Sequence, residues 1–156
     1  LYTARKEGRL HRNFMGYTVT ASAMLIGLGV SAISDTGTAL VQNEKELSNY
    51  VAAVDRCETA VYRGHFLSEE DQLFRRYILD IACKGETILQ EKFAGLVNEH
   101  CLPALADMEK DGLVSVSNQT ITLTSMGRYF LRNVCATFDI YLQQSASGRP
   151  AFSKSI

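Results

Sequence analysis

The chain has little of what several protein classes need: it contains no tryptophan, only two prolines and four cysteines, and its formal net charge is −1. A balanced charge argues against nucleic-acid binding, because proteins that bind phosphate backbones usually present a basic face. No apolar run reaches the roughly 18–20 residues that a membrane-spanning helix needs. We therefore expect a soluble protein with no nucleic-acid partner and no membrane segment.

Metal-binding spacing is also absent. The cysteines and histidines are scattered along the chain, and no pair has the short separation typical of metal ligands: Cys57, Cys83, Cys101, Cys135, His11, His65 and His100. Small hydrophobic thiols of this kind are usually buried and reduced. We expect no metal site, no disulfide framework and a cytoplasmic location.

What the chain does have is a hydrophobic content of 46% over 156 residues, enough for a medium-sized α+β, mostly helical fold with a core. Residues 1–9 are predicted to end a helix near Gly8, and residues 10–20 to be extended. Two short strands that can pair are predicted, one ending at residue 34 and one over 37–43. Residues 59–67 are predicted to be extended.

Helical patterns begin at residue 43. Asn43 followed by Glu46 resembles a capping box, and an apolar stripe follows it: Leu47, Tyr50, Val51 and Val54. Ser68 with Asp71 predicts the start of a second helix, whose buried face is expected to be Phe74, Tyr77, Ile78 and Ile81.

A third helical region is predicted over 87–111, divided near Pro103 and ended by Gly112. Its expected inward side chains are Phe93, Leu96, Val97, Cys101, Leu105 and Met108. Residues 113–124 alternate around a Ser-Asn-Gln turn and predict a β-hairpin. A last helix is predicted over 125–144 with Phe130, Leu131, Val134, Phe138 and Tyr141 inward. The order helix, helix, hairpin, helix is typical of a winged-helix-like module, and the remaining residues 146–156 are expected to be a flexible tail.

The stretch GLGVSAIS at 27–34 combines two glycines with small residues just after RNFMGYT at 12–18. Gly27 and Gly29 allow a tight turn or a close backbone approach to a ligand. The residues alone leave both interpretations open.

Several blocks, taken together in order, resemble the C-terminal part of the oxygen-independent coproporphyrinogen III oxidases (dehydrogenases), radical S-adenosylmethionine (radical-SAM) enzymes of haem biosynthesis. The blocks cover nearly the whole chain: Gly8-Arg9-Leu10, Arg12-Asn13-Phe14, Gly16-Tyr17-Thr18, Gly27 with 29–34, Gln42-Asn43, Arg63-Gly64, Arg75-Arg76, KDGLV at 110–114, Arg132-Asn133 and Phe138-Asp139. No single block is decisive, but their common register is specific.

The resemblance implies oxidative decarboxylation of coproporphyrinogen III to protoporphyrinogen IX by a longer protein, with a [4Fe-4S] cluster and S-adenosyl-L-methionine as cofactors. Residues 1–42 would be the terminal segment of the catalytic barrel, and residues 43–145 a winged-helix-like domain. The cluster needs a short run of three cysteines that is missing here. We therefore expect an inactive fragment without catalytic residues or cofactors of its own, whose partner is the missing N-terminal radical-SAM barrel.

The resemblance also implies that Ile33 and Met15 contact a second S-adenosylmethionine. The family often has glutamine at the position of Met15 and an acidic residue at that of Met24, so the local polarity is reduced. Gly27 and Gly29 would let the backbone approach the ligand. Arg9 and Arg12 could bind substrate carboxylates, since guanidinium forks suit them, but exposed surface charge explains them equally well. The same two roles are open to four further arginines: Arg63, Arg75, Arg76 and Arg132.

Two alternatives stay open. One is a related radical-SAM or haem-handling homologue without oxidase activity, which the cysteine motif outside this chain would distinguish. The other is a winged-helix DNA-binding module, whose recognition helix should carry basic and amide side chains. The third helical region is instead rich in acidic residues: Glu91, Glu99, Asp107 and Glu109.

Overall fold

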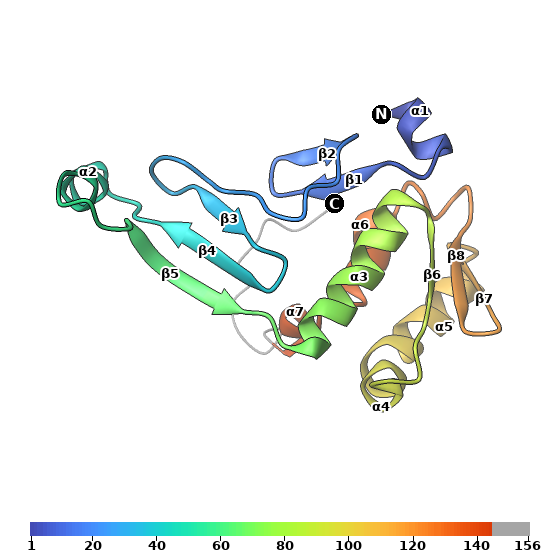
Figure 1. Cartoon of the computed structure of the whole chain (residues 1–156). Coiled ribbons are helices and arrows are strands. Elements are labelled where there is room, and N and C mark those ends of the chain that lie inside the picture. Colours follow the sequence, from blue (N-terminus) through green and yellow to red (C-terminus); the bar gives the residue numbers. More distant parts are fainter. Residues whose placement is uncertain (145–156) are drawn as a thin grey trace.

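The computed structural model describes residues 1–144, which form two regions joined at residues 67–68 (Figure 1). Within the described part of the chain, no helix combines the length and apolarity needed to cross a membrane. The tail predicted over 146–156 lies outside the described residues.

The first region opens with helix α1 (Tyr2–Lys6) and a hairpin of strands β1 (His11–Asn13) and β2 (Gly16–Thr18). Helix α1 ends as predicted, because Gly8 has a φ of 69° and its N–H donates to the carbonyl of Arg5. Strand β1 lies against helix α3 (Glu69–Cys83) of the second region. The hairpin therefore sits between the two regions.

Three antiparallel strands follow in the order β3–β4–β5: β3 (Ile33–Asp35), β4 (Ala39–Asn43) and β5 (Val61–Phe66). The predicted pairing of the first two strands is confirmed, and the extended segment adds the third. Helix α2 (Leu47–Asp55) connects β4 to β5 at the end of the sheet that is farther from α3 (Figure 1).

The predicted start of α2 is wrong. Asn43 is the last residue of β4, and Glu46 occupies the N-cap position without a side-chain capping bond. The apolar stripe is also not buried: Leu47 is 66% exposed, Val51 and Val54 are exposed, and the only buried residue of α2 is Ala53. Instead of capping a helix, the Asn43 amide donates to the carbonyls of Gly27 and Gly29.

The second region begins with α3 (Glu69–Cys83), and its capping box is confirmed. The Asp71 N–H donates to Ser68 Oγ over 3.1 Å, and the Ser68 N–H donates to the Asp71 carboxylate over 2.8 Å. Phe74, Tyr77 and Ile81 are buried, as predicted.

The helix predicted over 87–111 starts later than expected, because β6 (Glu86–Ile88) pairs with β8 (Thr120–Leu123). The helix then runs through α4 (Ala94–Leu96), a π-helical turn η1 (Val97–Cys101) and α5 (Leu102–Lys110) without a gap. Pro103 lies in the first turn of α5, where its missing N–H is tolerated, so it marks a change of helix type rather than a break. Gly112, with a φ of 70°, ends α5 as predicted.

The predicted hairpin is confirmed as β7 (Val114–Ser117) and β8 (Thr120–Leu123), in a sheet of order β6–β8–β7. Its turn places Asn118 and Gln119 at positive φ, which favours a tight two-residue connection.

The final helix is not continuous. Residues 125–130 form turns, followed by α6 (Leu131–Ala136) and α7 (Ile140–Gln144). Gly127 packs so closely on the residue before β7 that a Cβ there would lie 1.8 Å from the Leu113 carbonyl oxygen, which fixes the turn. The Asp139 carboxylate then accepts from the Leu142 N–H and restarts the helix. Phe130 and Tyr141, expected inside, are exposed in consequence.

One hydrophobic core lies in the second region, and every buried member of it falls between residues 73 and 140: Leu73, Phe74, Tyr77, Ile81, Val97, Cys101, Leu105, Val114, Ile121, Leu123, Val134, Phe138 and Ile140. The inward side chains predicted for the third helical region all lie in or against this core. The first region joins it through an ion pair of Asp35 on β3 with Arg75 on α3.

Candidate functional site

Side chains from three elements donate to or accept hydrogen bonds from the loop that contains Gly27 and Gly29, called the glycine loop below. The Asn43 amide donates to the carbonyls of Gly27 and Gly29, over 3.0 and 2.9 Å. The Gly27 N–H donates to Ser34 Oγ over 3.0 Å, and the Gly29 N–H donates to the Tyr50 hydroxyl over 3.1 Å. The loop is therefore held in one shape by β3, β4 and α2.

The two glycines meet different demands of this loop. A Cβ at Gly27 would lie 2.8 Å from the Ile33 carbonyl oxygen, so the close approach there is to the protein's own backbone. Gly29 has a φ of 98°, which side chains rarely adopt. Packing thus explains Gly27 and backbone conformation explains Gly29, and the approach of either to a ligand stays a prediction.

Ile33 lies half-buried at the start of β3, opposite Gln42 of β4. It lines a hollow of about 270 Å³ together with Phe14 and Arg63. The Arg63 Nε donates to the Gln42 side-chain carbonyl over 2.9 Å, which leaves its other N–H groups for a further partner. The site is a small mixed hollow with one cation at its edge.

The tip of the β1–β2 hairpin consists of Phe14 and Met15, and the two point to different surroundings. Phe14 lines the Ile33 hollow, whereas Met15 is 90% exposed and is not among the residues that line it. The structure therefore brings Phe14, not Met15, to Ile33. The sequence did not identify Phe14 as a site residue, because the alternation of side chains along a strand does not continue through a hairpin turn.

A larger groove of about 720 Å³ adjoins this hollow and shares Phe14, Leu40 and His65 with it. Its walls are mainly apolar, from β4, β5, α3 and α7. Its rim is polar: the Tyr141 hydroxyl donates to Asp71 over 2.9 Å, and His65 Nε2 lies 3.5 Å from the same carboxylate.

The Asp71 carboxylate at this rim favours the ionised state. Burial alone would raise the pKa of Asp71, but hydrogen bonds from Ser68 and Tyr141 outweigh it and hold that pKa below its ordinary value. Glu70 and Asp139 line the same groove. Three carboxylates thus line this groove together with His65 and with Arg75, which is paired with Asp35.

The structure does not bring Arg9 or Arg12 to the Ile33 hollow. Arg9 donates to Glu7, its neighbour two residues away, in an exposed pair. The Arg12 guanidinium lies over the Tyr17 ring, 5.3 Å from its centroid. Each has a structural partner, and contact with a substrate stays a prediction for both.

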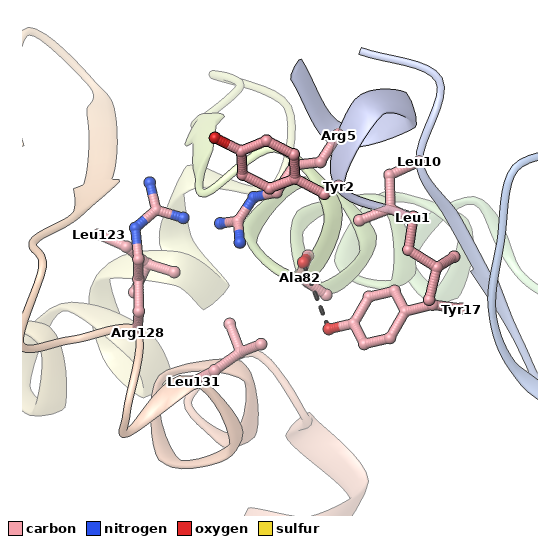
Figure 2. A pocket seen from close by; sticks show the side chains of 9 residues that line it. All are labelled: Leu1, Tyr2, Arg5, Leu10, Tyr17, Ala82, Leu123, Arg128 and Leu131. Carbon is pink, nitrogen blue, oxygen red and sulfur yellow. Dashed lines mark hydrogen bonds between the residues drawn. The ribbon is translucent and has the colours of Figure 1, made fainter. Parts of the chain in front are cut away.

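A separate hollow of about 260 Å³ lies where α1, the β1–β2 hairpin and the end of α3 meet the start of α6 (Figure 2). The Tyr17 hydroxyl donates to the Ala82 carbonyl over 3.4 Å at its edge. Four leucines line it together with two arginines, Arg5 and Arg128: Leu1, Leu10, Leu123 and Leu131. Sequence reasoning identified neither arginine, because they lie 123 positions apart and only the fold brings them to one hollow.

The cysteines do not fit an iron–sulfur cluster. Among residues 1–144, no three histidine, cysteine or acidic side chains gather in a way that could hold a metal ion. Burial raises the pKa of Cys101 and of Cys135 to about 11, so both stay protonated, whereas a cluster needs thiolates. Burial also raises the pKa of Cys83. Of the expected buried thiols, Cys83 and Cys101 are buried, Cys135 is half-buried and Cys57 is exposed.

No protein-family model matches the chain. The chain is 41% identical over 153 residues to the oxygen-independent coproporphyrinogen III oxidase of Escherichia coli, covering 94% of this chain and 33% of that protein. It is 33% identical to the enzyme of the same name from Pseudomonas aeruginosa, covering 100% of this chain and 35% of that protein. The chain thus spans about a third of the length of the curated relatives it matches.

A solved structure matches as well. It superposes with a TM-score of 0.78 at 37% identity, over 90% of this chain and 34% of that one, and is described as the coproporphyrinogen III oxidase HemN of Escherichia coli, a radical SAM enzyme. By fold and sequence, the chain is homologous to part of a radical SAM enzyme. Its relatives within that class are the oxygen-independent coproporphyrinogen III oxidases.

Proposed function

We propose that the chain is the C-terminal part of an oxygen-independent coproporphyrinogen III oxidase. The observation that carries this proposal is the agreement of two alignments over nearly the whole chain: 41% identity over 94% of it to a curated enzyme, and a TM-score of 0.78 to a solved one. The proposed reaction converts two propionate side chains of coproporphyrinogen III to vinyl groups and gives protoporphyrinogen IX.

The residues of this chain do not fit the [4Fe-4S] cluster, so we assign its binding, and that of the S-adenosylmethionine it cleaves, to a barrel supplied by the rest of the enzyme. Those cofactors supply the radical chemistry when bound. This chain contributes walls to the substrate and cofactor sites, and alone it is inactive.

Within that enzyme, residues 1–42 complete the edge of the barrel, and residues 43–145 form a winged-helix-like domain that covers the active site. The order of α3, β6, the helix of α4 to α5, and the β7–β8 hairpin supports this assignment. So do the apolar side chains that the first region leaves exposed, since a barrel partner would cover them.

Ile33 is proposed to contact a second S-adenosylmethionine in the hollow that it shares with Phe14. Phe14 offers an apolar wall, and the free N–H groups of Arg63 offer a partner for a carboxylate. Met15 lies at the hairpin tip outside this hollow, so it would contact the same ligand only if the ligand extended out of the hollow toward the proposed barrel. Arg9 and Arg12 are retained as proposed substrate contacts.

The test is anaerobic turnover of coproporphyrinogen III by the full-length, cluster-reconstituted protein, comparing Ile33→Ala with Leu28→Ala as the matched control. Leu28 is 86% exposed in the same loop and lines neither hollow beside Ile33. We expect product from the wild type and the control, and strong loss with Ile33→Ala. Equal product from all three would reduce Ile33 to packing. No product from a cluster-loaded wild type would favour the homologue without oxidase activity.

A further inference from the structure

The hollow in Figure 2 places two guanidinium groups, from opposite ends of the described chain, against an apolar wall. Arg5 belongs to α1, and Arg128 to the turn before α6. No carboxylate lines this hollow, and neither side chain has an ion pair or hydrogen bond to another described residue. Two like charges facing one hollow repel each other unless an anion lies between them.

The position of Arg128 is fixed by its surroundings. Its backbone belongs to the turn in which Gly127 packs against Leu113, and the Gly127 N–H donates to Thr124 Oγ1 over 2.9 Å. Its guanidinium lies over Gly85, where a Cβ would be 3.4 Å from it. Arg128 is exposed, and this contact places its guanidinium at the rim of the hollow, where it can meet a ligand that enters from solvent.

A structural role at the end of α3 does not account for the two arginines. Helix C-termini attract cations, but three of the last four carbonyls of α3 already have donors, and neither arginine donates to the fourth, that of Cys83. The Asp80 and Ile81 carbonyls accept from the Gly85 N–H over 3.1 Å each, and the Ala82 carbonyl accepts from the Tyr17 hydroxyl. The donors of Arg5 and Arg128 remain for another acceptor.

We propose that this hollow binds a carboxylate on a short apolar stem, with Arg5 and Arg128 as its two cationic contacts. A volume of about 260 Å³ is below the usual size of a site for a whole cofactor, so only part of a larger ligand enters. Resting on the proposed function, the stem is a propionate arm of a tetrapyrrole, whose body extends through the open side. The larger groove is less suited to such an arm. Three carboxylates line it, those of Glu70, Asp71 and Asp139, while its Arg75 and His65 already lie against Asp35 and Asp71.

The test is equilibrium binding of coproporphyrin III to the full-length protein, followed by porphyrin fluorescence. We compare wild type, Arg5→Gln and Arg128→Gln with Arg56→Gln, whose exposed guanidinium is paired with Glu58 away from the hollow. We expect each hollow variant to bind about tenfold more weakly or worse, as for a lost charged hydrogen bond, and the control to bind like wild type. Coproporphyrin III tetramethyl ester, which lacks the anions, should bind wild type weakly and the variants no worse.

Unchanged affinity in both hollow variants, or equal losses for the acid and its ester, would overturn the proposal, as would a wild type that does not bind coproporphyrin III. Circular dichroism of each exposed-arginine variant separates a binding defect from misfolding. Turnover separates the two proposals. If the wild type turns over substrate but its porphyrin binding does not depend on the two arginines, the hollow is not the binding site and the proposed enzyme activity stands. If the wild type is inactive but its porphyrin binding depends on the arginines, the hollow stands as a binding site and the proposed activity is wrong.

Discussion

Residues 69–144 bury their large side chains against one another, whereas residues 1–66 leave theirs on the surface. In the second region, Tyr77, Leu105 and Phe138 are fully buried in one core. The hydrophobic residues buried in the first region are all alanines: Ala4, Ala39, Ala53 and Ala60. All six residues of β5 are exposed, and Phe66 at its end is 88% exposed.

This difference teaches which region can stabilise itself. Burial of apolar surface is the main favourable term in folding, and the second region has its own. The first region is held by hydrogen bonds, by local turns and by two contacts of charged groups with α3, Asp35 with Arg75 and His65 with Asp71. Its exposed apolar side chains suit a part that is completed by another surface, as the proposed barrel would do.

The largest expected effect comes from the core. Phe138→Ala removes a fully buried ring that packs against Tyr77 at 5.6 Å between centroids. We expect the free energy of unfolding to fall by about 3–5 kcal/mol. Val51→Ala on α2, at an exposed position, should change it by less than about 0.5 kcal/mol. Urea unfolding of this chain measures both, and similar losses would mean that α2 is buried in solution.

The ion pair of Asp35 with Arg75, which joins the two regions, should have the next largest effect on the free energy of unfolding. Asp35 is buried and Arg75 half-exposed, so Arg75→Met, which leaves the carboxylate without its cation, should cost about 2–3 kcal/mol. Lys110→Met, at an exposed pair with Asp107, is the matched control and should cost less than about 1 kcal/mol. A loss no larger than the control's would show that the joint does not stabilise the fold.

The same joint predicts a pH dependence. Burial would raise the pKa of Asp35, but hydrogen bonds from Arg75 and the Gly37 N–H outweigh it and lower that pKa. The folded pKa is thus below the unfolded one, so the carboxylate stabilises the fold above the unfolded value of about 3.9 and loses this effect as the pH falls through the folded value. The free energy of unfolding should therefore depend less on pH in the acid range for Asp35→Asn than for the wild type. The same pH profile in both proteins would contradict this prediction.

A smaller effect is expected at the glycine loop. Asn43→Ala removes both amide bonds to the carbonyls of Gly27 and Gly29, and should cost about 1–2 kcal/mol. Hydrogen exchange should speed up at the Gly29 amide, which the Tyr50 hydroxyl normally protects. The core amide of Ile81 serves as the internal control. Equal exchange at Gly29 in wild type and variant would mean that Asn43 does not hold the loop.

The smallest difference compares the starts of two helices. Ser68→Ala breaks the capping box of α3 and should cost about 1 kcal/mol. Glu46→Ala, at the start of α2, removes no side-chain capping bond and should cost close to nothing. Thermal unfolding of the two variants side by side tests this, and equal shifts would show that the α3 cap adds no stability.

The sequence predicted features that depend on neighbours along the chain. The capping box at Ser68, the glycine end at Gly112 and the hairpin over 113–124 each close within a few residues, so residue type decides them. The buried face of α3 was equally readable from its spacing. The alignments, too, follow from the order of residues alone, and they led to the same relatives as the motif blocks.

Only the tertiary structure decided where distant groups meet. Asn43 has the sequence context of a helix cap, yet it bonds to a loop 14 and 16 residues earlier in the chain. Glu86–Ile88 is a strand because β8 pairs with it, and Phe14 rather than Met15 faces Ile33 because of a hairpin turn. Arg5 and Arg128 share a hollow because the fold brings α1 and the turn before α6 to the same end of α3. Such contacts depend on which surfaces the packed core brings together, and the local preferences of residues for helix, strand or turn do not determine this.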